Sequence, residues 1–296
     1  MASTRGSSGS GRTHAGRGGG GGSGGWRSGS ASVSRRHFDD YWSLSTRPLH
    51  GAVLLALFVA AFEVGSVLYL RIESAGLQHT VRAKRLLDLL FQHFGVAGFM
   101  ATGIAMLTVL LVWHMLRRDP WVVRPIVLAG MLLEACLWAL PILVFGTIFR
   151  RAAAAWALAD PGAMAGGGVF LPALASDGTD LMQLSWQARA TIAIGAGIYE
   201  EMLFRLIGIA VVHLIVKDLL QASELVARTV AIAATAIMFA LYHDVSSLPP
   251  AEKWAALAFY FAAGSYFGVI YVTRGLGVVV AAHAVYDILA LVILAR

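Results

Sequence analysis

The sequence contains few charged side chains and only one cysteine. Charged residues make up 14% of its 296 residues, against about 25% in ordinary soluble domains. In contrast, 58% are hydrophobic and the mean hydropathy is +0.70. This composition excludes a soluble enzyme or a DNA-binding factor and indicates an integral membrane protein. Because Cys136 has no second cysteine to pair with, an intrachain disulfide and a cysteine-based metal site are also excluded.

The positive charge of the chain is concentrated in its first 47 residues. They carry seven arginines and two aspartates, a net charge of +5, whereas the other 249 residues carry 16 basic and 15 acidic side chains, a net charge of +1. Residues 1–34 include 12 glycines and 9 serines. Such a segment cannot bury enough apolar surface to offset its ordering entropy. We therefore expect a disordered tail over 1–47 and no nucleic-acid partner.

Seven apolar stretches are long enough to cross a bilayer, which takes about 20 helical residues. They lie at 49–71, 94–116, 124–148, 188–216, 226–243, 254–273 and 276–295. Between the first two, residues 77–92 mix basic and apolar side chains and predict an amphipathic helix in the membrane interface. A loop is expected at 151–186, with a short re-entrant piece near 166–176 as an option.

The predicted fold class is all-α: a polytopic transmembrane helical bundle of about seven spans with a disordered N-terminal tail. The expected divisions are the tail at 1–47, N-terminal transmembrane helices and a loop at 48–184, and a helical core at 185–296. The distribution of lysine and arginine places the N-terminus in the cytoplasm. We expect a multi-pass integral membrane protein, in a bacterial inner membrane.

Charged side chains at membrane depth cost several kcal/mol and are functional candidates by default. The fourth span contains Glu200, Glu201 and Arg205. Glu201 and Arg205 are four residues apart and can pair on one helix face. Glu200 points about 100° away from Glu201, so it is free to face a different helix.

The fifth and seventh spans add further polar groups at helical spacing. Phe239 and His243 share a face, which places an aromatic ring beside an imidazole, and His283 and Asp287 are again four residues apart. Polar groups on three helices can be buried together if they converge on one wet cavity. A carboxylate and an imidazole there can hold a water and take its proton, and a second imidazole with another polar group can stabilise an oxyanion. The pattern therefore favours hydrolysis.

The three motifs together resemble the CPBP family of intramembrane proteases, the CAAX-protease and bacteriocin-processing group. The family pattern is EExxxR, FxxxH and HxxxN/D on three successive helices. Here it reads Glu200-Glu201-Met-Leu-Phe-Arg205, Phe239-Ala-Leu-Tyr-His243 and His283-Ala-Val-Tyr-Asp287. The resemblance covers residues 185–296.

The resemblance implies a glutamate-type intramembrane endopeptidase acting on a membrane-associated or C-terminally processed protein. It implies that Glu200 with His243 activates water, and that His283 with Asp287 forms the oxyanion site. Glu201, Arg205 and Phe239 would support them. An ionised aspartate cannot donate a hydrogen bond, so Asp287 is either protonated or orients His283.

Two other classes of function use the same buried residues: a non-catalytic membrane scaffold and a proton-coupled transporter. The HExxH string of site-2-type zinc proteases and the presenilin-like GxGD string are both absent. We expect no cofactor. A metal ion held by Glu200, His243 and His283 is the lesser alternative, and these ligands suit zinc.

Overall fold

A computed structural model describes residues 41–70, 82–93, 101–159, 181–246 and 248–294, within one compact unit, Asp39–Arg296. Over these ranges every regular element is a helix, which confirms the all-α prediction. Five helical segments are long and apolar enough to span a bilayer, so a count of seven is not confirmed. They are α2 (Pro48–Gly65) with η1 (Ser66–Leu70), α6 (Pro125–Ala159), α9 (Glu224–Tyr242), α10 (Pro250–Arg274), and α11 (Leu276–Ile288) with η5 (Leu289–Ile293). The chain is thus a multi-pass integral membrane protein.

The two remaining predicted spans are also helical. The second appears as α5 (Ala101–Arg117), an apolar helix of 17 residues, and residues 94–100 of that prediction lie outside the described residues. The fourth is an unbroken helical stretch of α7 (Trp186–Glu201), η3 (Met202–Ile209), α8 (Ala210–Leu214) and η4 (Ile215–Leu219). Every 18-residue window of this stretch includes three or more charged side chains. The charged candidate site residues therefore make this stretch more polar than an ordinary membrane span.

The connecting segments differ in part from the prediction. Helix α6 continues to Ala159, well into the loop expected at 151–186, and the optional re-entrant piece lies outside the described residues. The amphipathic segment forms α4 (Arg82–His93), which buries Ala83 and Leu87 and exposes Leu86 and Leu89. Its location in the membrane interface stays a prediction. The expected tail includes a short helix at 41–45, and its residues before 41 lie outside the described part.

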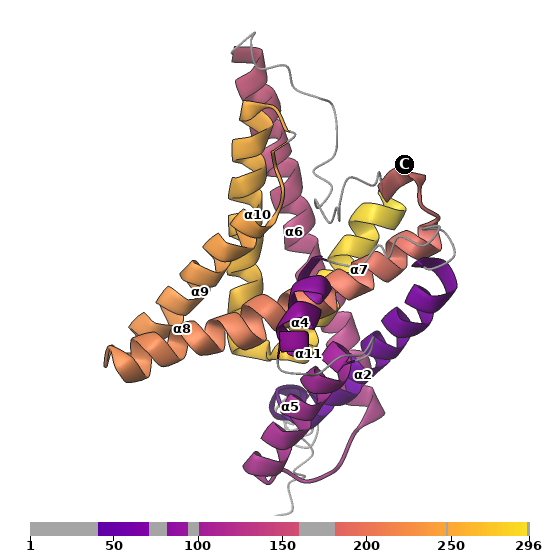
Figure 1. Ribbon diagram of the computed structural model, residues 1–296, viewed down its shortest axis with the longest axis vertical. Helices are drawn as coiled ribbons and strands as arrows, with labels where there is room; N and C mark the ends of the chain where they lie inside the picture. Colours follow the sequence, from indigo (N-terminus) through magenta and orange to yellow (C-terminus); the bar gives the residue numbers. More distant parts are fainter. Residues whose placement is uncertain (1–40, 71–81, 94–100, 160–180, 247, 295–296) are drawn as a thin grey trace, which may run out of the picture. The chain divides into compact units, whose positions relative to one another are not determined.

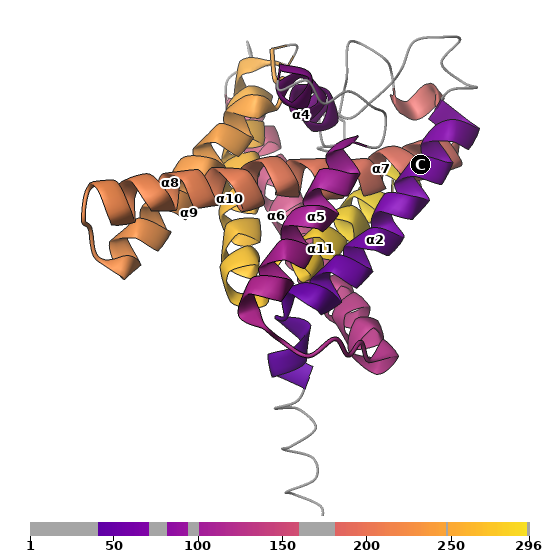
Figure 2. The ribbon, with the colours of Figure 1, turned by 60° about the horizontal axis from the view of Figure 1, so that its bottom comes forward.

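Helix α11 occupies the centre of the bundle and contacts α2, α6, α7 and α10 (Figure 1). Of the residues in the span formed by α11 and η5, 72% are buried within the protein, against 28–50% in the other candidate spans. Figure 2 shows the α7–α8 stretch crossing the bundle beside α11. The turn between α10 and α11 requires Gly275, whose φ of +83° lies in the left-handed region that side chains disfavour. This turn returns the chain to the centre directly after α10.

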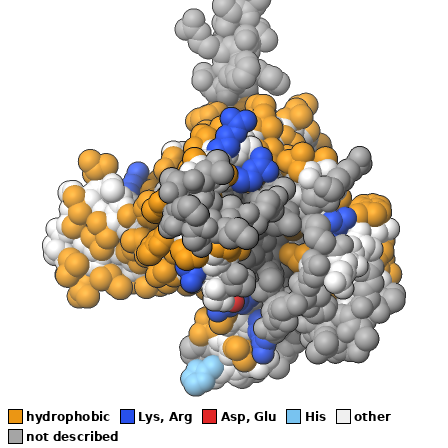
Figure 3. Space-filling model, turned by 90° about the horizontal axis from the view of Figure 1, so that it is seen from above, with side chains coloured by type: hydrophobic (Ala, Val, Ile, Leu, Met, Phe, Trp, Pro, Cys, Tyr) orange, Lys and Arg blue, Asp and Glu red, His pale blue; other side chains and the backbone are white. Residues whose placement is uncertain are grey.

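The outward surfaces of the helices are apolar. Large hydrophobic side chains such as Leu133 on α6, Leu225 on α9 and Trp254 on α10 are more than half exposed. On the face seen from above, hydrophobic side chains cover much of the described surface, Lys and Arg side chains show at several places, and acidic side chains show only at one small spot (Figure 3). This arrangement suits a hydrocarbon environment, in which the acidic groups must find partners inside the protein.

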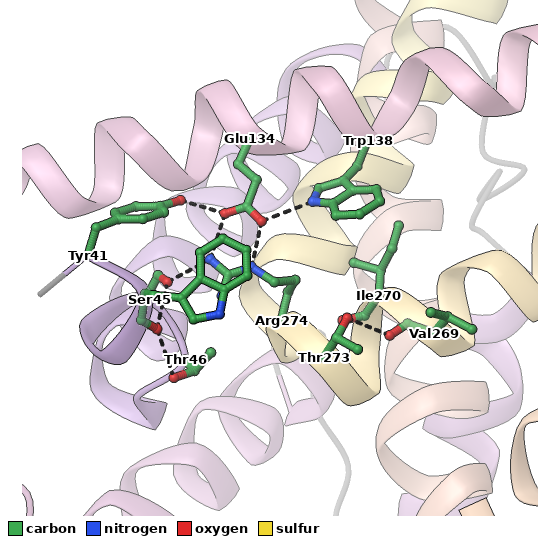
Figure 4. A network of polar contacts seen from close by, with 10 residues as sticks. Tyr41, Ser45, Thr46, Glu134, Trp138, Val269, Ile270, Thr273 and Arg274 are labelled. Carbon is green, nitrogen blue, oxygen red and sulfur yellow. Dashed lines mark hydrogen bonds and ion pairs between the residues drawn. The ribbon is translucent and has the colours of Figure 1, made fainter. Parts of the chain in front are cut away.

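A buried ion pair joins α6 to the end of α10 (Figure 4). Arg274 donates from Nε to Glu134 Oε1 at 2.5 Å and from Nη2 to Glu134 Oε2 at 2.8 Å. The same carboxylate accepts hydrogen bonds from the Tyr41 hydroxyl at 2.5 Å and from Trp138 Nε1 at 2.9 Å. Arg274 also donates to Ser45 Oγ at 2.8 Å. The network therefore fastens residues 41–45 to the bundle and places Glu134 in a structural role.

Candidate functional site

The three charged candidate residues of the α7–η3 stretch lie fully inside the protein. Glu200, Glu201 and Arg205 have 1%, 0% and 1% of their surfaces exposed. Glu201 Oε1 lies 3.0 Å from Arg205 Nη1, which confirms the predicted pair. Arg205 Nη2 also donates to the carbonyl of Gly264 on α10 at 3.2 Å. The helix changes from α to π geometry directly after Glu201, a departure that is frequent at functional sites.

A close approach of α7 and α11 brings the carboxylates to the seventh predicted span. At Gly197 a Cβ atom would lie 2.8 Å from the backbone nitrogen of Ala284 and 2.9 Å from the carbonyl oxygen of Val280. Glycine is thus the residue that lets the two backbones touch. Gly197 lies about one turn before Glu200 and Glu201, and Ala284 follows His283 directly. The contact therefore places both glutamates beside the imidazole of His283.

His283 is surrounded by three carboxyl groups. Its Nδ1 lies 2.6 Å from Glu201 Oε1, and its Nε2 lies 3.4 Å from Asp287 Oδ2 and 3.9 Å from Glu200 Oε2. The predicted facing of His283 and Asp287 is confirmed, and Glu200 does face another helix. The contact between Glu201 and His283 was not predicted. Helical spacing relates residues of one helix and does not indicate which carboxylate turns toward α11.

His243 lies just beyond the end of α9, where its backbone turns extended. The last carbonyls of a helix lack intrahelical partners. His243 Nδ1 lies 2.7 Å from the carbonyl oxygen of Phe239 and satisfies one of them. A carbonyl only accepts, so Nδ1 carries the hydrogen, and Nε2 is the basic nitrogen of the neutral ring. The rings of Phe239 and His243 meet edge to face with centroids 4.7 Å apart, as their spacing predicts.

The predicted pair of Glu200 and His243 is not in direct contact. Within the described part of the chain, no hydrogen bond or ion pair joins these two residues. Glu200 Oε2 and Asp287 Oδ1 are buried without a hydrogen-bond partner among those residues, and Asp287 Oδ2 has only its 3.4 Å contact with His283 Nε2. Buried polar atoms of this kind need a partner such as water or substrate to offset their desolvation. The unpaired oxygens therefore mark where a polar molecule is expected to bind.

Aromatic rings that sequence reasoning missed complete the site. Tyr260 and Phe267 of α10 stack on His243 and His283, with ring centroids 3.8 Å and 4.6 Å apart. The guanidinium carbon of Arg205 lies 4.5 Å from the ring centroid of Phe239 and 5.3 Å from that of Phe267. The seven-residue spacing of Tyr260 and Phe267 on α10 was the signal that could have indicated this arrangement. Buried aromatic residues at helical spacing are, however, common in any core.

The described residues include no group of three or more His, Cys, Asp or Glu side chains arranged to hold a metal ion. The zinc alternative named Glu200, His243 and His283. Of these, Glu200 and His283 approach to 3.9 Å, while Nδ1 of His243 is occupied by a carbonyl. The absence of a cofactor and the zinc alternative both stay predictions.

These features define a class: a polytopic helical membrane protein with a buried site of carboxyl, imidazole and guanidinium groups. Residues 183–289 match the family model described as type II CAAX prenyl endopeptidase Rce1-like. This segment contains all seven predicted site residues, and the match confirms for it the resemblance to the CPBP family of CAAX proteases. Comparisons with curated proteins and with solved structures gave no match.

Proposed function

We propose that this chain is an intramembrane endopeptidase that hydrolyses a peptide bond of a membrane-associated or C-terminally processed protein. The observation that carries the proposal is the convergence of Glu200, His283 and Asp287 in one buried cluster near His243, inside the segment that matches an endopeptidase family. The cluster lies within a bilayer-spanning bundle, so the substrate bond must reach the membrane interior or its border.

Glu200 and His243 are the proposed pair that activates water. Glu200 Oε2 has no hydrogen-bond partner among the described residues, and His243 presents Nε2 as its basic nitrogen. A general base acts over a direct hydrogen bond or through one water. A water held between the carboxylate and the imidazole would give up its proton as its oxygen attacks the carbonyl carbon. The lack of direct contact between the two side chains leaves this position to the water.

His283 is the proposed donor to the oxyanion. Glu200, Glu201 and Asp287 would bring three negative charges into the site, against one positive charge on Arg205. Buried charges are tolerated when they are compensated. A protonated His283 supplies a second positive charge and donates from both ring nitrogens. Nδ1–H is held by Glu201, and Nε2–H makes only a long contact of 3.4 Å with Asp287 Oδ2, which an oxyanion would replace as the acceptor.

Asp287 is proposed to orient His283. Its Oδ2 lies 3.4 Å from Nε2, and an ionised carboxylate has no hydrogen with which to bind an oxyanion itself. The sequence left two possibilities for Asp287, a protonated donor to the oxyanion or a residue that orients His283, and the distance between Oδ2 and Nε2 supports the second. Glu201 is proposed to fix the opposite side of the ring, and Arg205 to compensate the charge of Glu201.

The test compares membranes that contain the wild-type chain with membranes that contain Glu200→Gln, by mass spectrometry of new protein termini. Termini should appear with the wild-type chain and with the controls but not with Glu200→Gln, and His243→Ala and His283→Ala should abolish them as well. Glu63→Gln is the matched control, because Glu63 is also buried in the bundle but contacts Tyr199 rather than the site. His213→Ala, half-exposed beside Glu224, serves as the histidine control.

Retained cleavage in Glu200→Gln would refute the mechanism. Complementation of a deletion by a cleavage-dead Glu200→Gln would instead favour the scaffold. Substrate-driven proton flux in liposomes would favour the transporter.

A further inference from the structure

Helix α10 carries none of the three polar motifs, yet it places an aromatic ring against each site histidine. The planes of Tyr260 and His243 are inclined by 12° with centroids 3.8 Å apart, and those of Phe267 and His283 by 18° at 4.6 Å. Both pairs are therefore stacked, unlike the edge-to-face contacts that Phe239 makes with the same two histidines. Tyr260 is 4% and Phe267 is 1% exposed, so neither ring is displaced toward lipid.

The spacing of the two rings follows from helical geometry. Residues 260 and 267 are seven apart, which is about two turns or about 10 Å along the axis of α10, and they lie on one face. Other aromatic residues of α10 point elsewhere. Tyr266 packs on Trp138 and Phe145 of α6, and Phe261 is 42% exposed. One rigid helix thus supplies platforms for two imidazoles that belong to two other helices.

The polar contacts of each imidazole are made by its ring nitrogens. His243 Nδ1 is held by the carbonyl of Phe239, and His283 is held at Nδ1 by Glu201, with Asp287 Oδ2 3.4 Å from its Nε2. Such contacts fix the positions of nitrogen atoms but leave the ring plane free to tilt about them. A stacked neighbour removes the tilt, because the two planes must stay nearly parallel to keep their contact. The direction of each Nε2 is then determined by the hydrogen bond and the platform together.

We propose that Tyr260 and Phe267 are positioning residues that hold the imidazole planes of His243 and His283. The proposal rests on the proposed peptidase function for its effect on rate, but the platform itself is a property of the fold. It assigns the role of Tyr260 in holding His243 to its ring. The two residues touch the histidines and act through them.

The kinetic experiment uses Tyr260→Leu, Phe267→Leu and Tyr260→Phe in the full chain. Aromatic pairs contribute about 0.5–1.5 kcal/mol beyond burial, which corresponds to about a two- to tenfold loss of kcat in each leucine variant, with KM little changed. Tyr260→Phe keeps the ring and should match the wild type. Phe261→Leu is the control, because Phe261 is an aromatic residue of the same helix that is 42% exposed and lies outside the platform.

A second measurement does not depend on cleavage. Diethyl pyrocarbonate modifies accessible imidazoles in their unprotonated form, so the reaction is run at alkaline pH, and peptide mass spectrometry reports the rate at each histidine separately. Tyr260→Leu should raise the rate at His243 and leave His283 unchanged, and Phe267→Leu should do the reverse. Tyr260→Phe and Phe261→Leu should leave both rates at the wild-type value. Should a leucine variant fail to fold, Tyr260→Phe, which retains the six-membered ring, is compared with Tyr260→Trp, which replaces that ring with a larger one.

The outcomes separate the platform from the function. Unchanged modification rates in both leucine variants would overturn the platform, as would a loss of kcat in Tyr260→Phe equal to that in Tyr260→Leu. If the leucine variants show site-selective changes in modification but the wild-type chain cleaves nothing, the platform is supported and the peptidase function is rejected. Site-selective changes together with the expected loss of kcat would support both.

Discussion

Replacing Glu134 by glutamine should destabilise the fold strongly, because Glu134 is the counter-ion of a buried arginine. Its carboxylate accepts four hydrogen bonds, two of them from Arg274 in a bidentate pair. The side chain of Arg274 is 1% exposed and that of Glu134 is 13% exposed. Glutamine keeps the shape of the side chain but removes its charge, so the guanidinium stays buried without compensation.

The expected cost follows from the burial of the pair. Removing one partner of a buried ion pair costs about 3–5 kcal/mol, a large part of the roughly 5–15 kcal/mol by which proteins are stable. Residues 41–45 should also lose their attachment, because Tyr41 contacts this carboxylate and Ser45 contacts Arg274. The free energy of unfolding of Glu134→Gln should therefore fall by about 3–5 kcal/mol, while the surface control Glu224→Gln should change it little.

Reversible unfolding in detergent micelles measures this difference. Arg274→Met added to Glu134→Gln should recover part of the loss, because the double variant no longer contains an uncompensated charge. The reasoning is refuted if Glu134→Gln loses less than about 1 kcal/mol, or if the double variant loses the sum of the two single losses.

Three further predictions concern the candidate site. Gly197→Ala should lower the free energy of unfolding by about 1–3 kcal/mol and reduce cleavage, because the added Cβ would overlap Ala284. Gly146→Ala should be neutral, because the nearest atom to its added Cβ lies at 3.7 Å. Equal melting temperatures for the two variants would contradict this prediction. Glu201→Gln should lower kcat at least tenfold, since it weakens the contacts to both Arg205 and His283, and unaltered kinetics would remove Glu201 from the site. Cleavage should persist after exhaustive chelation, and its loss with recovery on adding zinc would establish the metal alternative instead.

Much of the site was predictable because its key pairs lie within a single helix or, for Phe239 and His243, at the end of one. The pairs Glu201–Arg205, Phe239–His243 and His283–Asp287 each join residues four apart, and the helical period brings such residues to one face. The membrane class was equally accessible, since composition reports directly on the solvent that a fold requires. The span count was less accessible, because Glu200, Glu201 and Arg205 make the α7–η3 stretch unlike an ordinary apolar span.

Contacts between helices depend on how each helix is rotated and how closely it packs, and no local period encodes either. Only the tertiary structure paired Glu134 with Arg274, 140 residues apart, and turned Glu201 rather than Glu200 to the Nδ1 atom of His283. It likewise placed the rings of α10 against both histidines. The sequence by itself determined a helical membrane protein with scarce inward charges. Backbone contact at Gly197 and packing around α11 decided which of those charges meet.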